Sequence, residues 1–144
     1  MTKKGFTLIE VMLTMSLLGI LALLSSPFYG RFIFSQEVPV VYDELEGSFA
    51  KAQLYSMTGN NDAMWGVAVN GDNIILFQGT SFASRDQAFD ETFVIHPRVT
   101  VSGLSEVVFA RTTGRPDSQP TVTLSGNGTT ESYTLNSEGV LAAQ

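Results

Sequence analysis

The sequence predicts an α+β protein in which a long N-terminal helix precedes an antiparallel β domain. The first observation is an apolar run from Phe6 to Leu24 that contains one ionisable residue, Glu10. The second is a helical spacing of apolar residues that continues to about Ser56. The third is a change, from Ala63 onward, to short runs with the period of β-strands. A helix followed by consecutive strands is typical of the α+β class.

The composition limits the classes of function that the chain can have. Its 144 residues fit one globular domain with an appended segment, because domains commonly contain about 100 to 150 residues. The formal net charge is −6, which disfavours general binding of nucleic acid through its phosphates. The chain has no cysteine, so disulfide bonds and thiolate metal sites are excluded.

The apolar run is long enough to cross a membrane as a helix. Its nineteen residues would extend over roughly 28 Å at a rise of about 1.5 Å per residue, close to the thickness of a bilayer's hydrocarbon core. Lys3 and Lys4 precede it and favour a cytoplasmic N-terminus. A secretory signal peptide is the alternative. Against it, the run exceeds a typical signal core of about 7 to 15 residues, and no clear small-x-small cleavage site precedes Pro27.

Glu10 is the informative residue of this run. A carboxylate within a membrane span costs on the order of 2.5 to 3.5 kcal/mol unless it is paired, protonated or near the interface. If the chain were cut after Gly5, Phe6 would carry a free amine four residues from Glu10, one helical turn away. That amine, from the same chain or from a neighbouring chain, could neutralise the carboxylate. In the second case the ion pair would drive assembly.

The stretch KKGFTLIEVMLTMSLLGILA resembles the class III leader and first helix of type IV pilins and of the pseudopilins of type II secretion. The resemblance implies that a prepilin peptidase cleaves between Gly5 and Phe6 and methylates the new Phe6 amine. It also implies that Glu10 recruits subunits into a helical filament. Pro27 falls where such helices often carry a proline, and the ring of Pro27 predicts a kink there. A simple helix end at Pro27 is the alternative.

A second helical pattern covers residues 35–58. Charged residues lie between its apolar residues, so one face should pack on a globular domain. Pro39 and Gly47 weaken the pattern, and the helix is expected either to be broken near Pro39 or to run unbroken. The stretch TGNND, from Thr58 to Asp62, ends it. The apolar residues at steps of three and four are Val38, Val41, Leu45, Phe49 and Ala52.

Residues 63–144 are predicted to form the antiparallel β domain. MWGVAV and NIILFQ flank the turn sequence NGD, and PTVTLSG and TTESYTLN flank Asn127 and Gly128, so each pair should form a hairpin. A polar connection, GTSFASRDQAFDE, separates the first hairpin from the runs TFVIH, RVTV and EVVFART. GVLAA could close the sheet. Trp65 is expected to be a core residue.

The C-terminal half is similar to the GspH/FimT group of minor pseudopilins and minor pilins. Some members of that group bind DNA through an arginine after the final glycine, whereas this chain ends SEGVLAAQ. Arg98, Arg111 and Arg115 could form a small basic patch, but solvated loop arginines are the favoured interpretation in so acidic a chain. The residues that carry the similarity are Val107 to Phe109, Gly114, Val122 to Leu124, Tyr133 to Leu135, Gly139 and Val140.

The sequence offers no catalytic, metal or cofactor site. The one histidine, His96, precedes Pro97 at the end of a predicted strand, which is a poor position for catalysis. No phosphate-binding loop of the G-x-x-x-x-G-K-[ST] kind occurs, so assembly would need a separate ATPase. DQAFDE and NGDN could line a weak calcium site, but a polar loop and a hairpin turn explain them better.

The sequence therefore indicates a structural protein that is not an enzyme. The first hypothesis is a minor subunit of the type II secretion pseudopilus that supports protein export. The second is a minor pilin of a type IV pilus for adhesion, motility or DNA uptake. The third is a membrane-anchored binding module that never polymerises. Residues 1–5 would be a leader, residues 6–34 a transmembrane and filament-core helix, and residues 35–58 an amphipathic helix that continues into the domain.

The resemblance also implies a location and a set of partners. The chain would cross the bacterial inner membrane once, with a cytoplasmic N-terminus and a periplasmic domain, before it enters a filament. The partners would be a prepilin peptidase, other pilins or pseudopilins, an assembly-platform membrane protein and the separate ATPase. Nucleic acid is not an expected partner.

Overall fold

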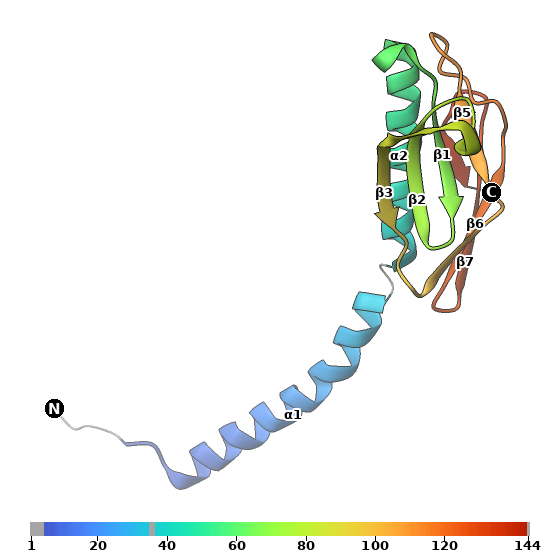
Figure 1. Cartoon of the computed structure of the whole chain (residues 1–144). Helices are drawn as coiled ribbons and strands as arrows, with labels where there is room; N and C mark the ends of the chain where they lie inside the picture. The colour runs from blue at the N-terminus through green and yellow to red at the C-terminus, as the bar shows by residue number, and fades with distance from the viewer. Residues whose placement is uncertain (1–4, 35–36, 144) are drawn as a thin grey trace. The chain divides into compact units, whose positions relative to one another are not determined.

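The computed structural model describes residues 5–34 and 37–143, and it describes side chains for residues 5–23 and 37–143. The chain divides into two units, Met1–Ser35 and Gln36–Gln144. The first contains one helix, α1 (Leu8–Phe34), drawn in blue in Figure 1. Within the described residues, no helix proves long and apolar enough to cross a membrane. The membrane crossing expected for residues 6–34 therefore stays a prediction.

The second unit begins with helix α2 (Glu37–Thr58), which includes both Pro39 and Gly47 without interruption. Pro39 is the third residue of the helix, where the amide hydrogen that proline lacks would have no partner in the helix. No break therefore lies within α2, and the break expected near Pro39 stays a prediction on the N-terminal side of this helix. Residues 35 and 36, between the two helices, lie outside the described part of the chain.

In the part of the chain that the structure describes, eight strands form two separate four-stranded antiparallel sheets. The first sheet has the order β3-β2-β1-β5 and the second the order β4-β6-β7-β8. Figure 1 shows β1, β2 and β3 side by side in the first sheet. Two short 3₁₀ helices, η1 (Asn60–Asp62) and η2 (Phe82–Ser84), precede β1 and β3. The strands are β1 (Trp65–Asn70), β2 (Asn73–Gln78), β3 (Asp86–Val94), β4 (Val99–Ser102), β5 (Glu106–Phe109), β6 (Thr121–Gly126), β7 (Thr129–Leu135) and β8 (Leu141–Ala143).

Both predicted hairpins are present. In the β1–β2 hairpin Asn70 pairs with Asn73, and in the β6–β7 hairpin Gly126 pairs with Thr129. Asn127 and Gly128 both have positive φ, as a tight two-residue turn requires. The polar connection expected up to residue 91 is wrong in part, because β3 already begins at Asp86. The alternation of buried and exposed residues is weak in this edge strand, so the sequence pattern did not reveal it.

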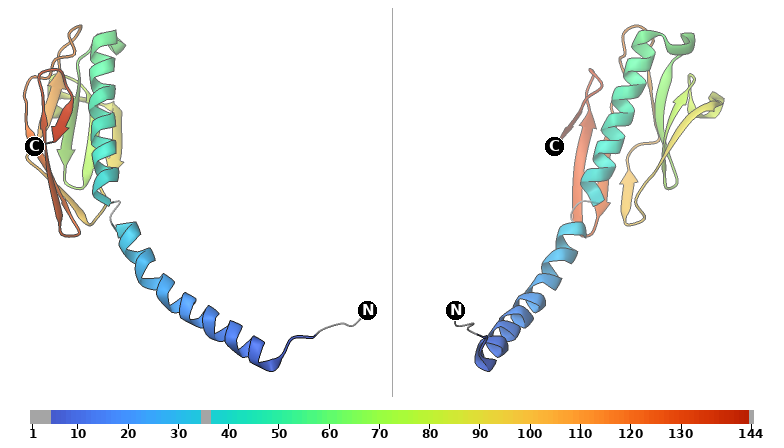
Figure 2. Two further views of the ribbon diagram at one scale, coloured as in Figure 1. Left: turned by 180° about the vertical axis from the view of Figure 1, so that it is seen from behind. Right: turned by 90° about the vertical axis from the view of Figure 1, so that its left-hand side faces the viewer.

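One face of α2 packs against both sheets and forms the core. Leu45, Phe49 and Ala52 are 0%, 1% and 0% exposed, which confirms the predicted buried stripe. The right-hand view of Figure 2 shows α2 beside the strands of both sheets. Trp65 is buried as predicted, and its indole N–H donates to the Asn60 carbonyl oxygen at 3.1 Å. From the sheets, the core takes Val67, Ile74, Leu76, Val99, Val107, Phe109, Val122, Leu124, Leu135 and Leu141.

Gln53 ties two loops to α2. Its side-chain amide donates to the carbonyl oxygens of Gly114 at 2.9 Å and Glu138 at 2.7 Å. Gly114 and Gly139 have φ of +62° and +83°, and a Cβ on either residue would meet Gln53 at under 3 Å. These glycines are therefore required both by their backbone conformation and by their close approach to Gln53.

We expect Gln53→Ala to destabilise the domain by about 1 to 2 kcal/mol, because two hydrogen bonds of roughly 1 kcal/mol each are lost. Urea denaturation of the full chain in detergent micelles, followed by the fluorescence of Trp65, measures this change. Leu54→Ala is the matched control, since Leu54 is the next residue of α2 and is 56% exposed. Equal denaturation midpoints for the two variants would contradict the role given to Gln53.

The hydrogen bond from the Tyr133 hydroxyl to Glu131 Oε2, at 2.5 Å, predicts a loss of stability at high pH. This bond, together with burial, raises the pKa of Tyr133 to about 12 from 10.0. A raised folded-state pKa contributes stability that is complete below about pH 10 and is lost as the pH approaches 12. Thermal unfolding of wild type and Tyr133→Phe from pH 9 to pH 12 measures the difference. Parallel curves would disprove the expectation.

Candidate assembly and processing site

The N-terminal residues meet the helix at Thr7, which caps it. The Glu10 N–H donates to the Thr7 carbonyl oxygen at 3.2 Å and to Thr7 Oγ1 at 3.4 Å. Thr7 and Glu10 thus have the spacing of a capping box, in which a threonine before the first turn accepts from the amide three residues on. The sequence reasoning missed this role of Thr7, although the pattern T-x-x-E before an apolar run is a recognised signal.

The predicted cleavage point lies just outside the helix. Gly5 and Phe6 have no regular secondary structure, and the Phe6 side chain is 83% exposed. Among the described residues, and apart from the chain neighbours of Gly5, no atom lies within 4 Å of the place that a Cβ on Gly5 would occupy. An exposed, non-helical segment with a glycine is the kind of backbone that a peptidase can approach closely.

Glu10 lies in the first turn of α1 and is exposed. Among the residues that the structure describes, its carboxylate has no ion-pair partner. The unpaired amide hydrogens of a helix N-terminus attract a negative charge, so this position is favourable for a carboxylate. The side chain is consequently available to a cation that does not belong to the described part of the chain.

The described part of α1 is apolar on all sides. Leu8 is 80% exposed and Leu23 is 79% exposed, and large apolar residues between them cover every face of the helix. A helix of this kind is normally buried in a protein core or a membrane. Other large exposed residues are Ile9, Val11, Met12, Leu13, Met15, Leu17, Leu18, Ile20 and Leu21.

The hydroxyl groups of this helix are satisfied within the helix itself. Thr14 Oγ1 donates to the Val11 carbonyl oxygen at 2.9 Å, and Ser16 Oγ donates to the Met12 carbonyl oxygen at 2.8 Å. Polar side chains that bond to their own backbone can enter an apolar medium at little cost. Glu10 is therefore the one group between Leu8 and Leu23 whose burial would require a partner from elsewhere.

Pro27 lies inside α1, which extends to Phe34, so the alternative that the helix ends at Pro27 is wrong. The structure does not describe the side chains near Pro27, so a kink at this residue is still only an expectation from the sequence.

The three arginines do not form the patch that the sequence allowed. Arg98 Nη1 lies 3.2 Å from Glu37 Oε1, at the first residue of α2, whereas Arg111 pairs with Asp62 beyond the last residue of the same helix. A helix of this length separates the two positions by roughly 30 Å. Arg115 lines a cavity of about 260 Å³, and its carbonyl oxygen accepts from the Ala110 N–H at 2.9 Å.

The remaining candidate positions are spread over the domain. The His96 side chain is 46% exposed, and its Nδ1 lies 3.9 Å from Glu37 Oε2. Within the described ranges, no three His, Cys, Asp or Glu side chains lie close enough together to hold a metal ion. In the stretch DQAFDE, Asp90 pairs with Arg85 at 2.8 Å and Glu91 pairs with Lys51, so two of its three carboxylates have a basic partner.

Comparisons with known proteins agree with this division of the chain. Residues 1–26 match the family model described as the prokaryotic N-terminal methylation motif. No curated protein sequence matches the chain. The fold is similar to that of the minor pseudopilin EpsH from the type 2 secretion system of Vibrio cholerae, with a TM-score of 0.54 and 10% sequence identity. The similarity covers 75% of this chain and 96% of EpsH. The chain therefore combines an N-terminal methylation motif with an α+β fold similar to that of a minor pseudopilin.

Proposed function

We propose that this protein is a minor subunit of a type II secretion pseudopilus, which it enters from the inner membrane and through which it supports protein export. The observation that carries the proposal is the joining of a methylation motif to a helix whose described side chains, up to Leu23, are apolar on all sides and include one carboxylate without an ion-pair partner among the described residues. The pseudopilin-like fold, which covers 75% of this chain, supports the assignment to this class of filament.

The first step is removal of the leader. A prepilin peptidase hydrolyses the peptide bond between Gly5 and Phe6 and transfers to the released amine a methyl group from a sulfonium methyl donor, which leaves as a thioether. The Thr7 cap lies after this bond, so the mature helix keeps its first turn. The product has a cationic amine at Phe6 and a carboxylate at Glu10, one helical turn apart.

The second step is docking in the membrane. Before docking, Glu10 is costly in an apolar medium, by an amount on the order of 2.5 to 3.5 kcal/mol. An amine from a neighbouring subunit, staggered by one turn, neutralises this charge. The apolar side chains around Glu10 then pack against other subunits instead of lipid. A membrane anchor that never polymerises has no need of such a carboxylate, and this argues against the third hypothesis.

The location follows from the N-terminal sequence. Lys3 and Lys4 keep the N-terminus in the cytoplasm, and the apolar run from Phe6 to Leu24 crosses the inner membrane once. The globular domain is then periplasmic. Growth of the filament requires an assembly-platform membrane protein and a separate ATPase, because the chain has no nucleotide-binding loop of its own.

We expect Glu10→Ala to be processed normally but excluded from filaments, because the incoming amine finds no buried charge to neutralise. Mass spectrometry of the mature protein gives the processing, and its amount in sheared filaments gives the assembly. Wild type and the control Glu138→Ala, which removes an exposed carboxylate between β7 and β8, should start at N-methylated Phe6 and assemble alike. Glu10→Ala should fall at least tenfold in the sheared fraction.

Two results would overturn this expectation. A mature protein that begins at Met1 or after Ser26 would refute processing at Gly5. Equal amounts of wild type and Glu10→Ala in the sheared fraction would refute the assembly role of Glu10.

We expect Gly5→Val to block cleavage, because a branched side chain prevents close approach of the peptidase to the backbone. The substitution has room in the isolated chain, where nothing lies within 4 Å of a Cβ on Gly5, so the fold should not change. Gly19→Ala has equal room and serves as the control. Intact-protein mass should show residues 1–5 retained in Gly5→Val and absent from Gly19→Ala. Removal of the leader from both would contradict the cleavage site.

A further inference from the structure

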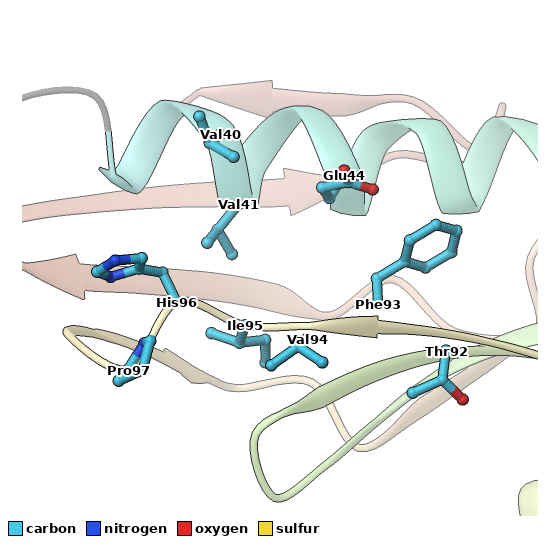
Figure 3. Close-up of a pocket in the computed structure, with 9 residues that line it drawn as sticks. All are labelled: Val40, Val41, Glu44, Thr92, Phe93, Val94, Ile95, His96 and Pro97. Atoms are coloured by element: carbon cyan, nitrogen blue, oxygen red, sulfur yellow. The ribbon is translucent and has the colours of Figure 1, made fainter.

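The open edge of β3 and the groove beside it form a surface that the proposed assembly does not use. The groove has a volume of about 500 Å³ and lies between the N-terminal half of α2 and residues 92–97, as Figure 3 shows. Val40, Val41 and Glu44 line it from the helix, and Phe93 and Ile95 line it from the strand side. We name this surface, Val40 to Glu44 with Thr92 to Pro97, the β3 groove.

The backbone along the β3 groove has hydrogen-bonding groups that face away from the sheet. The Ile95 N–H donates to the Asp72 carbonyl oxygen at 2.8 Å, and β3 pairs with β2 in continuous antiparallel register from Glu91 to Val94. Inward and outward hydrogen-bonding residues alternate in such a ladder. The amide and carbonyl groups of Thr92 and Val94 therefore point away from β2, toward the open edge.

The other edge of the same sheet is closed by the chain itself. Beside β5, Phe109 forms a bridge with Pro116, and the Asp117 N–H donates to the Val108 carbonyl oxygen at 2.9 Å. Asp117 Oδ1 also accepts from the Val108 N–H at 3.1 Å. β3 is the longest strand of either sheet and has no such cover from the described residues. An uncovered edge strand is a template for an added strand.

Charge decides which kind of strand can be added. β3 contains Asp86, Asp90 and Glu91 and no basic residue. Asp90 pairs with Arg85, and Glu91 pairs with Lys51. By contrast, Glu44 lies inside the groove and has no ion-pair partner among the described residues. A second copy of β3 would bring like charges together. A strand with a lysine or arginine would place a positive charge next to Glu44.

We propose that the β3 groove binds an extended, basic segment of a partner protein by strand addition. The backbone of that segment pairs with Thr92 and Val94. Its apolar side chains contact Val40, Val41 and Phe93, and a basic side chain between them pairs with Glu44. This surface does not include Gly5, Phe6 or Glu10. The binding test can therefore fail while the filament proposal stands, and the filament proposal can fail while binding at the β3 groove is observed.

A designed peptide tests the proposal on the full-length protein in detergent micelles. The probe has seven residues, with threonine at positions 1, 3, 5 and 7, valine at positions 2 and 6, and lysine at position 4. In an extended peptide, the lysine side chain then lies on the same face as the two valine side chains. Amide NMR shifts upon titration should be confined to residues 40–44 and 91–97. Replacement of the lysine by glutamate should weaken binding at least threefold, and Glu44→Lys in the protein should do the same.

Two further comparisons separate strand pairing from simple apolar contact. One peptide is N-methylated at its threonine amides and another at its valine and lysine amides. Only one of them should lose binding, because only alternate amides of an added strand face β3. In the protein, Thr92→Pro removes an outward N–H without removing a bond to β2 and should weaken binding at least tenfold, whereas Thr92→Val keeps that N–H and should bind as wild type does. The amide spectra of both variants verify that the fold is retained.

Several results would overturn the proposal. These are the absence of shifts at the β3 groove, equal binding of the lysine and glutamate peptides, and equal binding of the two N-methylated peptides. Concentration-dependent shifts of the same amides without any peptide would assign the edge to a second copy of this chain instead.

Discussion

The packing of one face of α2 against two sheets is the constraint on which the domain depends. The sheets are separate hydrogen-bonded units, and each has an inner face that needs a cover. Leu45 and Phe49 supply it, and each buried side chain of this size contributes about 1.5 to 3 kcal/mol. Once α2 is fixed, Gln53 can hold the loops of Gly114 and Glu138. The similarity to EpsH, at 10% identity, shows that this arrangement tolerates very different sequences.

The two helices serve different environments because their apolar residues are distributed differently. In α2 the buried side chains lie on one stripe, and Asp43, Glu44 and Glu46 are among the residues exposed outside it, which suits a helix half in water. In the described part of α1 the apolar residues lie on all sides, and the hydroxyls of Thr14 and Ser16 bond to the helix backbone. One carboxylate, Glu10, stands apart from that pattern. An unpaired charge is costly in an apolar medium, so a subunit that places a cation next to Glu10 is favoured over one that does not. This cost makes the ion pair specific for a correctly positioned partner.

Within the described ranges, the domain has no group of three His, Cys, Asp or Glu side chains that could hold a metal ion, and its sheet edges are its candidate recognition surfaces. One edge of the first sheet is closed by residues 115–117, and the other is left open beside an apolar groove with an acidic group. The acidic residues of β3 disfavour pairing between identical edges, a common way of avoiding aggregation. Glu44 in the groove, which has no ion-pair partner among the described residues, favours a basic partner. Arg98 and Arg111, each already paired with a carboxylate and at opposite ends of α2, contribute no continuous surface for phosphates.

The sequence alone determined the element types, both hairpins and the N-terminal motif, because these depend on neighbours within a few residues. Asn127 and Gly128 adopt positive φ locally, and the spacing of Val41, Leu45 and Phe49 defines a helical face by itself. Only the tertiary structure decided that the strands divide into two sheets, that β3 begins at Asp86, and that the arginines lie apart. The division into two sheets depends on pairing between residues distant in the chain, such as Trp65 with Phe109 and Val99 with Gly126. The start of β3 depends on the pairing of Gln78 with Asp86 across an irregular register, for which an exposed edge strand has no periodic signal.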